Sequence, residues 1–247
     1  KNKLHTLQIL SYYGIPVVKT VVIHEKQYLD MALKYLGSFP IVIKSINGSG
    51  GAGVAIAESK RSVQSAFSFM KDKQSTGNAL LLQEYISEAK GKDLRLFVVG
   101  EKVVGAMQRS APEGDFRSNI HQGGSGKAYQ PSAKERHLAI RATKAVGLEI
   151  AGVDIIETRH GPAVMEVNSN PGFEGLEQCT GINIAEAIGL QANLGGNHRL
   201  GAQLFKNSSK VLFRFPQAVS ESRIEKVDSQ IQRVAHRLHL IRMRSLD

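Results

Sequence analysis

The sequence predicts an α+β fold, in which antiparallel strands form sheets and helices pack against them. Two observations lead to this prediction. Short β-branched runs alternate with segments of helical periodicity, and several strands follow one another directly across Gly or Pro turns. Regular strand–helix–strand repeats, which would indicate a doubly wound parallel sheet, do not occur. The chain also carries no long internal repeat and no low-complexity segment.

The first third of the chain alternates between helices and strands. Gly14 and Pro16 end the first helix, and the glycine-rich stretch 45–53 joins two strands. In chain order, the expected elements are a helix at 3–13, a strand at 17–23, a helix at 25–36, strands at 39–44 and 54–57, a helix at 61–72 and a strand at 79–86.

Two hairpins dominate the rest of the chain. The first is expected from 94–100 and 102–109, with Gly100 and Glu101 at the turn, and the second from 151–158 and 163–168 across "RHGP". Between the hairpins, Ser132 and Glu135 have capping-box spacing. They predict a helix from about residue 132 to about residue 146.

Length and composition indicate a folded globular protein. The 247 residues suffice for one large domain or two modest subdomains, and 42% of them are hydrophobic. No apolar run reaches the roughly 18 residues typical of a membrane span, so we expect no membrane association. The N-terminal residues lack the apolar core and cleavage site of a signal peptide. The one cysteine, Cys179, excludes an intramolecular disulfide framework and favours the cytoplasm.

Positive charge is concentrated near the C-terminus. The formal net charge is +10, and residues 196–247 hold ten Lys or Arg against four Asp or Glu.

Apolar residues spaced by three and four predict an amphipathic helix over 222–243, with a capping-box pair at Ser222 and Glu225. This helix could pack on the parent domain, form a homo-oligomer or dock on ribosomal RNA. A tail without fixed order is a further alternative.

The stretch "GSGGAG", residues 48–53, matches G-x-G-x-x-G. A dinucleotide-binding fingerprint needs a helix directly after the glycines, but residues 54–57 predict a strand. A Walker loop carries its lysine after the glycines, whereas Lys44 precedes them. Two interpretations remain: a flap that closes over phosphates with Lys44 beside it, or an ordinary hairpin loop. A kinase-type loop is disfavoured because neither H-R-D nor D-F-G occurs.

The strand at 79–86 ends in polar residues that suit an adenine. Glu84 could accept from the amino group of the base, while the main chain at Tyr85 pairs with its edge. Asp93, a few residues later, could accept from ribose hydroxyls. A core strand with a polar end fits the same pattern, so these residues alone do not establish a nucleotide site.

The segment 113–126, "EGDFRSNIHQGGSG", has the composition of a loop but carries several functional side chains. Arg117 suits a γ-phosphate because a guanidinium binds phosphate oxygens bidentately. Asn119 and His121 lie in the same segment. His121 could shuttle a proton, but a solvated or hydrogen-bonded histidine is the favoured interpretation.

An acid and an amide stand two residues apart in "AVMEVN". Strand side chains alternate, so Glu166 and Asn168 point to the same side. Asp154 lies on the preceding strand, and if the two strands pair, three oxygen donors converge. Carboxylate and amide oxygens suit Mg²⁺, which takes few protein ligands and completes its shell with water and phosphates.

These segments together resemble a known family. Lys44 with the glycine flap, "QEYISEAKGKDLR", "GDFRSN", "AGVDI" and "MEVNSNPGFEG" occur in the order found in ATP-grasp ligases, and they are most similar to the RimK family of α-L-glutamate ligases. The resemblance covers about residues 1–190. It implies two α+β subdomains that grip ATP, over 1–90 and 91–195, followed by the basic tail 196–247.

The resemblance also implies an activity. A carboxylate is joined to an amine through an acylphosphate, with release of ADP and phosphate. In the family's founding member, L-glutamate is added to the C-terminus of a small-subunit ribosomal protein, which is a protein modification linked to protein biosynthesis. Glutamylation of a coenzyme or of an amino-group carrier protein is an alternative within the superfamily, and a non-catalytic ATP-binding module is an alternative from another class.

Site residues follow from the resemblance position by position. Lys44 would contact the ATP phosphates, Glu84 and Tyr85 the adenine, and Asp93 the ribose. The remaining roles concern acyl transfer, with Arg117 and Asn119 as the catalytic pair, and the binding of two Mg²⁺ or Mn²⁺ ions. The acyl-transfer and phosphate site would comprise Arg117, Ser118 and Asn119, and the metal ligands would be Asp154, Glu166 and Asn168.

The sequence departs from the family in three places. Ligases of this kind carry an additional N-terminal domain, so we expect this chain to correspond to the ATP-grasp portion alone. The family's paired basic residues after the first hairpin are Arg109 and Ser110 here. A basic residue before the Gly-Gly is replaced by Gln122. Both changes bear on recognition of an acidic substrate.

Overall fold

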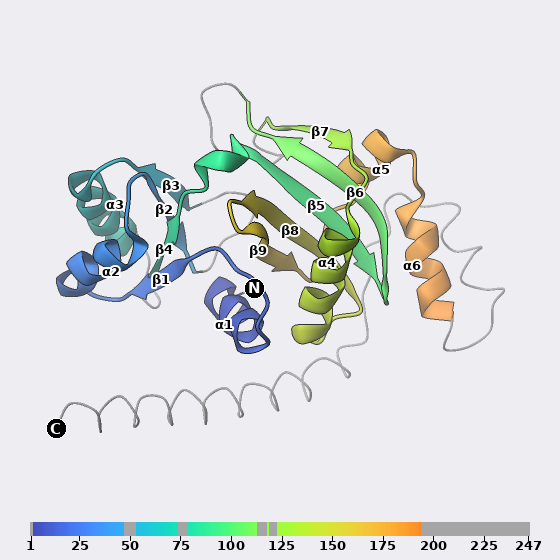
Figure 1. Ribbon diagram of the computed structural model, residues 1–247, viewed down its shortest axis with the longest axis horizontal. Coiled ribbons are helices and arrows are strands. Elements are labelled where there is room, and N and C mark those ends of the chain that lie inside the picture. Colours follow the sequence, from blue (N-terminus) through green and yellow to red (C-terminus); the bar gives the residue numbers. More distant parts are fainter. Residues whose placement is uncertain (1, 47–52, 74–78, 113–117, 119–122, 194–247) are drawn as a thin grey trace.

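The computed structural model describes residues 2–46, 53–73, 79–112, 118 and 123–193. Within these residues the chain forms two antiparallel sheets, one of four strands and one of five. Figure 1 shows them side by side, each with its own helices. The α+β class predicted from the hairpin pattern is confirmed.

The smaller sheet has the strand order β1-β4-β2-β3. Its strands are rich in Ile, Val and Leu, and two helices cover one face. The elements are β1 (Thr20–Ile23), a 3₁₀ turn η1 (Lys26–Tyr28), α2 (Leu29–Leu36), β2 (Ile41–Ser45), β3 (Val54–Ala57), α3 (Lys60–Lys73) and β4 (Leu80–Glu84). Residues 17–19 of the expected first strand lie outside β1, although Val17 makes an isolated parallel bridge to Val164 of the larger sheet.

The larger sheet has the strand order β7-β6-β5-β8-β9. Its elements are η2 (Ser87–Ala89), β5 (Lys92–Val99), β6 (Lys102–Ser110), β7 (Ser125–Ala128), α4 (Ala133–Ala145), β8 (Ile150–Thr158), β9 (Gly161–Asn168), α5 (Glu174–Thr180) and α6 (Ile184–Asn193). The first helix, α1 (Lys3–Tyr12), packs against this sheet, with contacts to β9 and α4. Figure 1 shows α1 and α4 along one side of the sheet.

Each sheet has its own apolar core. In the smaller sheet, Ile41, Ile43 and Leu82 pack against α2 and α3. In the larger sheet, alternate residues of the central strand β5 serve different cores. Leu96 and Val98 face α1 and α4, while Phe97 and Val99 face α5 and α6. A strand buried on both sides reads as a continuous apolar run, as "LRLFVVG" does.

Both predicted hairpins are confirmed. β5 pairs with β6 and β8 pairs with β9, and the turn residues Gly100 and Gly161 have φ of 59° and 102°, which favour glycine. The capping box is also confirmed. The Ser132 hydroxyl accepts from the Glu135 N–H at 3.3 Å, and the Glu135 carboxylate accepts from the Ser132 N–H at 2.6 Å.

Apart from the short 3₁₀ turn η2, three described elements were not predicted. β7 is a short edge strand that is exposed throughout, so it lacks an alternating pattern. The short helices α5 and α6 follow the glycine-containing segment after β9. Gly105 permits them to approach β6, because a Cβ there would lie 3.1 Å from Ile184 and 3.2 Å from Leu176.

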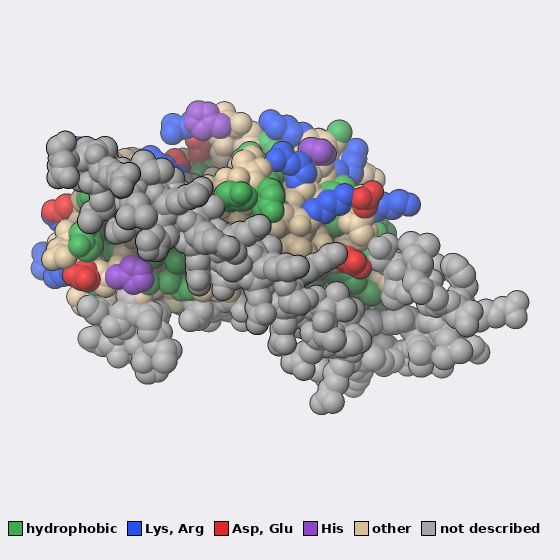
Figure 2. Space-filling view, turned by 90° about the horizontal axis from the view of Figure 1, so that it is seen from below, with side chains coloured by type: hydrophobic (Ala, Val, Ile, Leu, Met, Phe, Trp, Pro, Cys, Tyr) green, Lys and Arg blue, Asp and Glu red, His purple; other side chains and the backbone are tan. Residues whose placement is uncertain are grey.

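Several predictions concern residues outside the described ranges. These are the flap glycines Gly48, Gly50 and Gly51, the loop residues Arg117, Asn119, His121 and Gln122, and the tail 196–247 with its expected helix at 222–243. Among the described helices, none is long and apolar enough to cross a membrane. Figure 2 shows Lys and Arg side chains gathered along one edge of the described surface, in keeping with the basic composition.

The separate core of the smaller sheet gives a stability prediction. Leu82 is 0% exposed in that core, so Leu82→Ala should lower the free energy of unfolding by about 2–5 kcal/mol through lost burial and a cavity. Denaturant unfolding followed by circular dichroism measures the change.

Met31 provides the control, since it is 67% exposed on α2 of the same unit. Met31→Ala should change the free energy of unfolding by less than about 0.5 kcal/mol. Equal losses in the two variants would contradict the core assignment.

Candidate active site

One face of the larger sheet is divided between apolar and charged residues. Phe97, Val99 and Met107 lie under α5 and α6. Toward the other end of the same strands, the side chains become ionic. The charged and polar set comprises Asp93 and Arg95 on β5, Arg109 on β6, Asp154 on β8, and Glu166 and Asn168 on β9.

Strand register brings this set together. Asp93 lies directly opposite Arg109, and Arg95 directly opposite Asp154. Asp154 in turn lies opposite Glu166. Directly opposed residues in antiparallel strands share a face, with Cβ atoms about 5 Å apart. The sheet therefore juxtaposes Asp154 and Glu166, as the sequence predicted.

A β-bulge places Glu166 on the charged face. The register between β8 and β9 shifts between Asp154 and Ile155, so that Ile155 pairs with Val164 and Met165 is the extra residue. Without the bulge, Val164 and Glu166 would point to the same side. The bulge instead directs Val164 into the apolar core with Ile155 and Glu166 toward Asp154.

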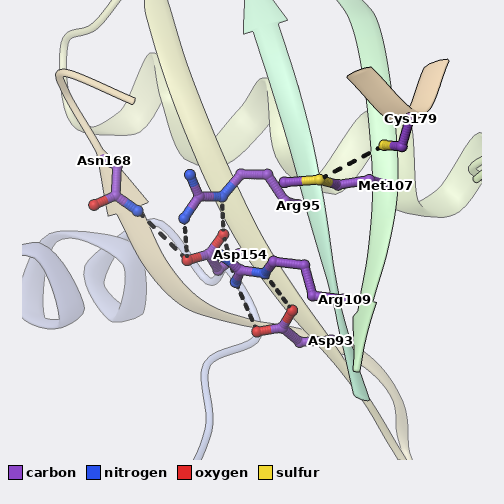
Figure 3. A network of polar contacts seen from close by, with 7 residues as sticks. All are labelled: Asp93, Arg95, Met107, Arg109, Asp154, Asn168 and Cys179. Carbon is purple, nitrogen blue, oxygen red and sulfur yellow. Dashed lines mark hydrogen bonds and ion pairs between the residues drawn. The ribbon is translucent and has the colours of Figure 1, made fainter. Parts of the chain in front are cut away.

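Asp154 is held by two arginines, as Figure 3 shows. Arg95 donates through Nε to Oδ1 and through Nη2 to Oδ2, the latter at 2.9 Å. Arg109 Nη2 lies 3.1 Å from Oδ1. Arg109 also makes a bidentate pair with Asp93, at 2.7 Å for both contacts. The Asn168 amide nitrogen completes the set, 3.4 Å from Asp154 Oδ2.

These groups are buried and charged. Asp93, Arg109 and Asp154 are each 5% exposed. Burial by itself raises the pKa of the Asp154 carboxyl, but Arg109 and Arg95 outweigh it and hold that pKa below its ordinary value. Burial likewise lowers the pKa of Arg109, but Asp154 and Asp93 raise it above the ordinary value. Asp154 and Arg109 therefore both stay ionised across the physiological pH range.

Lys44 reaches this site from the smaller sheet. Its Nζ donates to Gln83 Oε1 at 2.6 Å, and Gln83 Nε2 donates to the Thr20 hydroxyl at 2.9 Å. Desolvation lowers the pKa of Lys44 from 10.5 to about 8, while the nearby Glu166 carboxylate opposes this shift. Lys44 is thus within electrostatic reach of the acids on the larger sheet.

The predicted adenine contacts lie where β4 leaves the smaller sheet. The main-chain N–H of Glu84 donates to the Lys19 carbonyl at 2.9 Å, and its carboxylate lies 3.9 Å from Arg159. Tyr85 follows directly and is half-buried, as is Ser118. Among the predicted residues, the structure thus groups Lys44, Asp93, Asp154, Glu166 and Asn168, whereas Arg117 and Asn119 lie outside the described ranges.

Sequence reasoning did not assign three residues to this site, although it had noted Arg109 as part of a family motif. Arg95 and Arg109 carry positive charge inside strands that are otherwise apolar, and Gln83 holds Lys44. The alternation in "KDLRLF" was a usable signal, because Asp93 and Arg95 must point to one side of the strand. Which acids they meet depends on register, which the sequence does not specify.

The donor set fits a hard cation such as Mg²⁺. Two carboxylates and an amide oxygen are oxygen ligands, and the Asn168 amide presents its oxygen when it turns about its own axis. Within the described ranges, no cluster of three or more His, Cys, Asp or Glu side chains is found. Asp93 is paired with Arg109, so Asp154 and Glu166 are the acids proposed as ligands, in keeping with the small number of protein ligands that Mg²⁺ takes beside phosphates.

Comparison with known proteins identifies the family. The RimK-like ATP-grasp domain matches residues 1–190. The chain belongs to this family. Curated relatives from Picosynechococcus sp. and Nitrosococcus oceani, both named "Probable alpha-L-glutamate ligase", are 45% and 46% identical over 188 and 189 residues. Each match covers 76% of this chain and 62% of the relative, so the chain spans about three fifths of their length.

Solved structures confirm the ATP-grasp fold. A RimK domain protein from Sphaerobacter thermophilus has a TM-score of 0.61 at 26% identity, with 76% of this chain and 65% of that chain covered. The ATP-grasp ligase PsnB, solved with a minimal precursor, Mg and ADP, has a TM-score of 0.58 at 21% identity, with 78% and 57% covered. In this RimK-like chain, the charged face therefore lies within an ATP-grasp fold.

Gly152 gives the first prediction for the site. It lies opposite Asn168, and a Cβ there would stand 2.7 Å from Pro171 and 3.2 Å from Nη1 of Arg95. Gly152→Ala should therefore lower the free energy of unfolding by about 1–3 kcal/mol through overpacking. Gly172→Ala is the control, because nothing lies within 4 Å of its added Cβ. Similar thermal melts for both variants would refute the close approach.

Lys44 gives the second prediction. NMR of ¹³Cε-labelled lysines should show one signal titrating near pH 8, and Lys44→Met should remove that signal. Because the folded-state pKa lies below the ordinary 10.5, the folded protein binds fewer protons than the unfolded chain between these values. The contribution of Lys44 to the free energy of unfolding should therefore rise with pH across this window and be absent from Lys44→Met. A wild-type spectrum in which every lysine titrates at its ordinary pH would exclude the shift.

Proposed function

We propose that this chain is the ATP-grasp portion of a ligase that adds L-glutamate to the C-terminus of an acceptor protein, with a small-subunit ribosomal protein as the first candidate. The observation that carries the proposal is the convergence of Asp154, Glu166 and Asn168 on the larger sheet. The positively charged Lys44 of the smaller sheet lies within electrostatic reach of them. The curated relatives named "Probable alpha-L-glutamate ligase" support the ligase class and glutamate as substrate.

The chemistry requires ATP and two carboxylate-bound cations, Mg²⁺ or Mn²⁺. A carboxylate oxygen of the acceptor attacks the γ-phosphorus, and ADP leaves, which gives an acylphosphate. The amine of glutamate then attacks the acyl carbon, phosphate leaves and the amine gives up a proton. Bound cations would offset the negative charge of the phosphates during the first transfer. PsnB, solved with a minimal precursor, Mg and ADP, supports Mg²⁺ as a cofactor, and PsnB solved with a precursor peptide supports a peptide acceptor.

The chain's own residues have distinct proposed roles. Asp154, Glu166 and Asn168 hold the metal cations. Lys44, which lies on the smaller sheet, neutralises the charge of the phosphate oxygens. Glu84 and Tyr85 border the adenine. Asp93 borders the ribose with the lone pairs that its bidentate contact to Arg109 leaves free. Arg117, Ser118 and Asn119 line the acyl-transfer site.

The organisation proposed from sequence accompanies this function. Residues 1–90 would form the unit that carries the flap, 91–195 the unit that carries the cation ligands, and 196–247 a basic tail that binds a second copy or docks on ribosomal RNA. The single cysteine supports a cytoplasmic protein. A ligase that glutamylates a small molecule differs only in the acceptor, so the assay below includes both classes.

The test measures activation of a carboxylate directly. The chain is incubated with ATP, Mg²⁺, glutamate and either ribosomal proteins or a metabolite extract, and mass spectrometry identifies products heavier by glutamate. Hydroxylamine should trap the acylphosphate as a hydroxamate, and phosphate release should require the acceptor. Acceptor-independent ATP hydrolysis without hydroxamate would contradict the proposed reaction.

Two variants connect this activity to the site. Glu166→Gln should reduce Mg²⁺-dependent phosphate release at least about a hundredfold, because a cation ligand loses its charge. Glu157→Gln, on the same hairpin but exposed, should retain the wild-type rate. Isothermal titration with Mg²⁺ and ADP shows whether each variant still binds nucleotide, so that loss of chemistry is separated from loss of binding.

A further inference from the structure

The two arginines at Asp154 differ in their partners. Arg109 makes two contacts to Asp93 and one to Asp154. Arg95 contacts Asp154 alone among the acids of the described residues, through Nε and Nη2. Arg109 therefore keeps a complete bidentate partner if Asp154 turns away, whereas Arg95 loses both of its ionic contacts.

Loss of its ionic contacts to Asp154 would be energetically costly for Arg95. Its side chain is 12% exposed, and a buried guanidinium without an anionic partner is strongly unfavourable. Without ligands, the network of two aspartates and two arginines has no net charge. A cation bound at Asp154 adds positive charge beside Arg95 and competes with it for the same carboxylate oxygens.

A second side of the Arg95 guanidinium is directed away from Asp154. Figure 3 shows Nη1 pointing away from the carboxylate, with no contact to the other residues drawn. The main chain at Gly152 lies close beside this nitrogen, because a Cβ added there would stand 3.2 Å from it. The contacts to Asp154 thus use Nε and Nη2 of Arg95 and leave Nη1 outside the network drawn.

We propose that Arg95 is a switch residue that exchanges Asp154 for an anionic group of the substrate, the transferring phosphoryl group or the carboxylate it meets. Without ligands, Arg95 holds Asp154 in a neutral ion pair. Once Asp154 and Glu166 hold a cation, the freed guanidinium of Arg95 requires an anion. Arg109, anchored by Asp93, stays in place and keeps Asp154 oriented. The inference rests on the proposed cation site.

This exchange couples the two ligands energetically. An anion at Arg95 removes the cost of releasing Asp154, and a cation at Asp154 makes Arg95 available to the anion. Each ligand should therefore raise the affinity of the other by the same factor, as linkage requires. The coupling would disfavour binding of the cation alone and favour a site that holds cation and phosphoryl group together.

The test measures Mn²⁺ binding to the whole chain by electron paramagnetic resonance, which needs no turnover. Mn²⁺ is titrated with ADP, and again with ADP plus beryllium fluoride, a mimic of the phosphoryl group. In the wild type, beryllium fluoride should tighten Mn²⁺ binding at least about tenfold, within the usual range of coupling. In Arg95→Met, Mn²⁺ should bind at least as tightly with ADP alone, and the tightening by beryllium fluoride should fall below about twofold.

Two variants separate a switch from a structural role. Arg95→Lys keeps a charge and should restore part of the coupling. Arg136→Met, in α4 and remote from the charged face, should leave the coupling unchanged. Coupling in Arg95→Met equal to that of the wild type would overturn the proposal. Failure of the wild type to bind Mn²⁺ under any of these conditions would instead overturn the proposed cation site.

A measurement on the wild type alone decides the question if Arg95→Met does not fold. The ¹⁵Nε–H signal of Arg95, assigned with Arg95→Lys, reports its hydrogen bond to Asp154. Mg²⁺ with ADP should shift this signal and speed its exchange with water, and beryllium fluoride should slow the exchange again. A signal that is unchanged by saturating Mg²⁺ and ADP would contradict release of Asp154.

Discussion

A buried carboxylate between two arginines is the constraint on which the rest of the site depends. Asp154, Arg95 and Arg109 come from three adjacent strands of the larger sheet, and each would be costly to bury without the others. A slip of one residue in any of these strands would send a charge into the apolar core on the opposite face. The ion pairs and the core therefore specify the same register.

The same sheet face is used for two purposes along its length. Phe97 and Met107 pack under α5 and α6, and a few residues further along the same strands the face becomes ionic. The apolar cluster under α5 and α6 includes Phe97 and Met107 but not Arg95 or Arg109, so the packed end lies beside the charged end of the same strands. This division allows a charged site to sit on a rigid sheet, which holds side chains more precisely than a loop does.

Lys44 connects the site to the second sheet. Its lowered pKa results mainly from desolvation, and Glu166 on the larger sheet partly offsets it. Because Lys44 and Glu166 lie on different sheets, the distance between them depends on how the two sheets are oriented. The bridge from Val17 to Val164 is one of the described contacts that set this orientation. The affinity for a ligand that contacts both Lys44 and the acids would therefore depend on how the two sheets are oriented.

The sequence by itself determined the hairpins and the capping box at Ser132 and Glu135, because these depend on turn residues and on periods of two or four that are local in the chain. It also placed Asp154 and Glu166 on the two strands of one hairpin. It also determined the family, through motifs that include Lys44 and the acids. It did not predict the exposed strand β7 or the short helices α5 and α6, whose patterns are too brief to be distinctive.

Only the tertiary structure decided how the site is completed. The alternation in "AVMEVN" puts Val164 and Glu166 on one side, and the bulge at Met165 separates them so that one enters the core and the other faces Asp154. The partners of Arg95 and Arg109 were likewise set by cross-strand register, over separations of 59 and 16 residues. Such contacts depend on the balance between burying apolar groups and pairing charges across the whole sheet, which no local stretch of sequence contains.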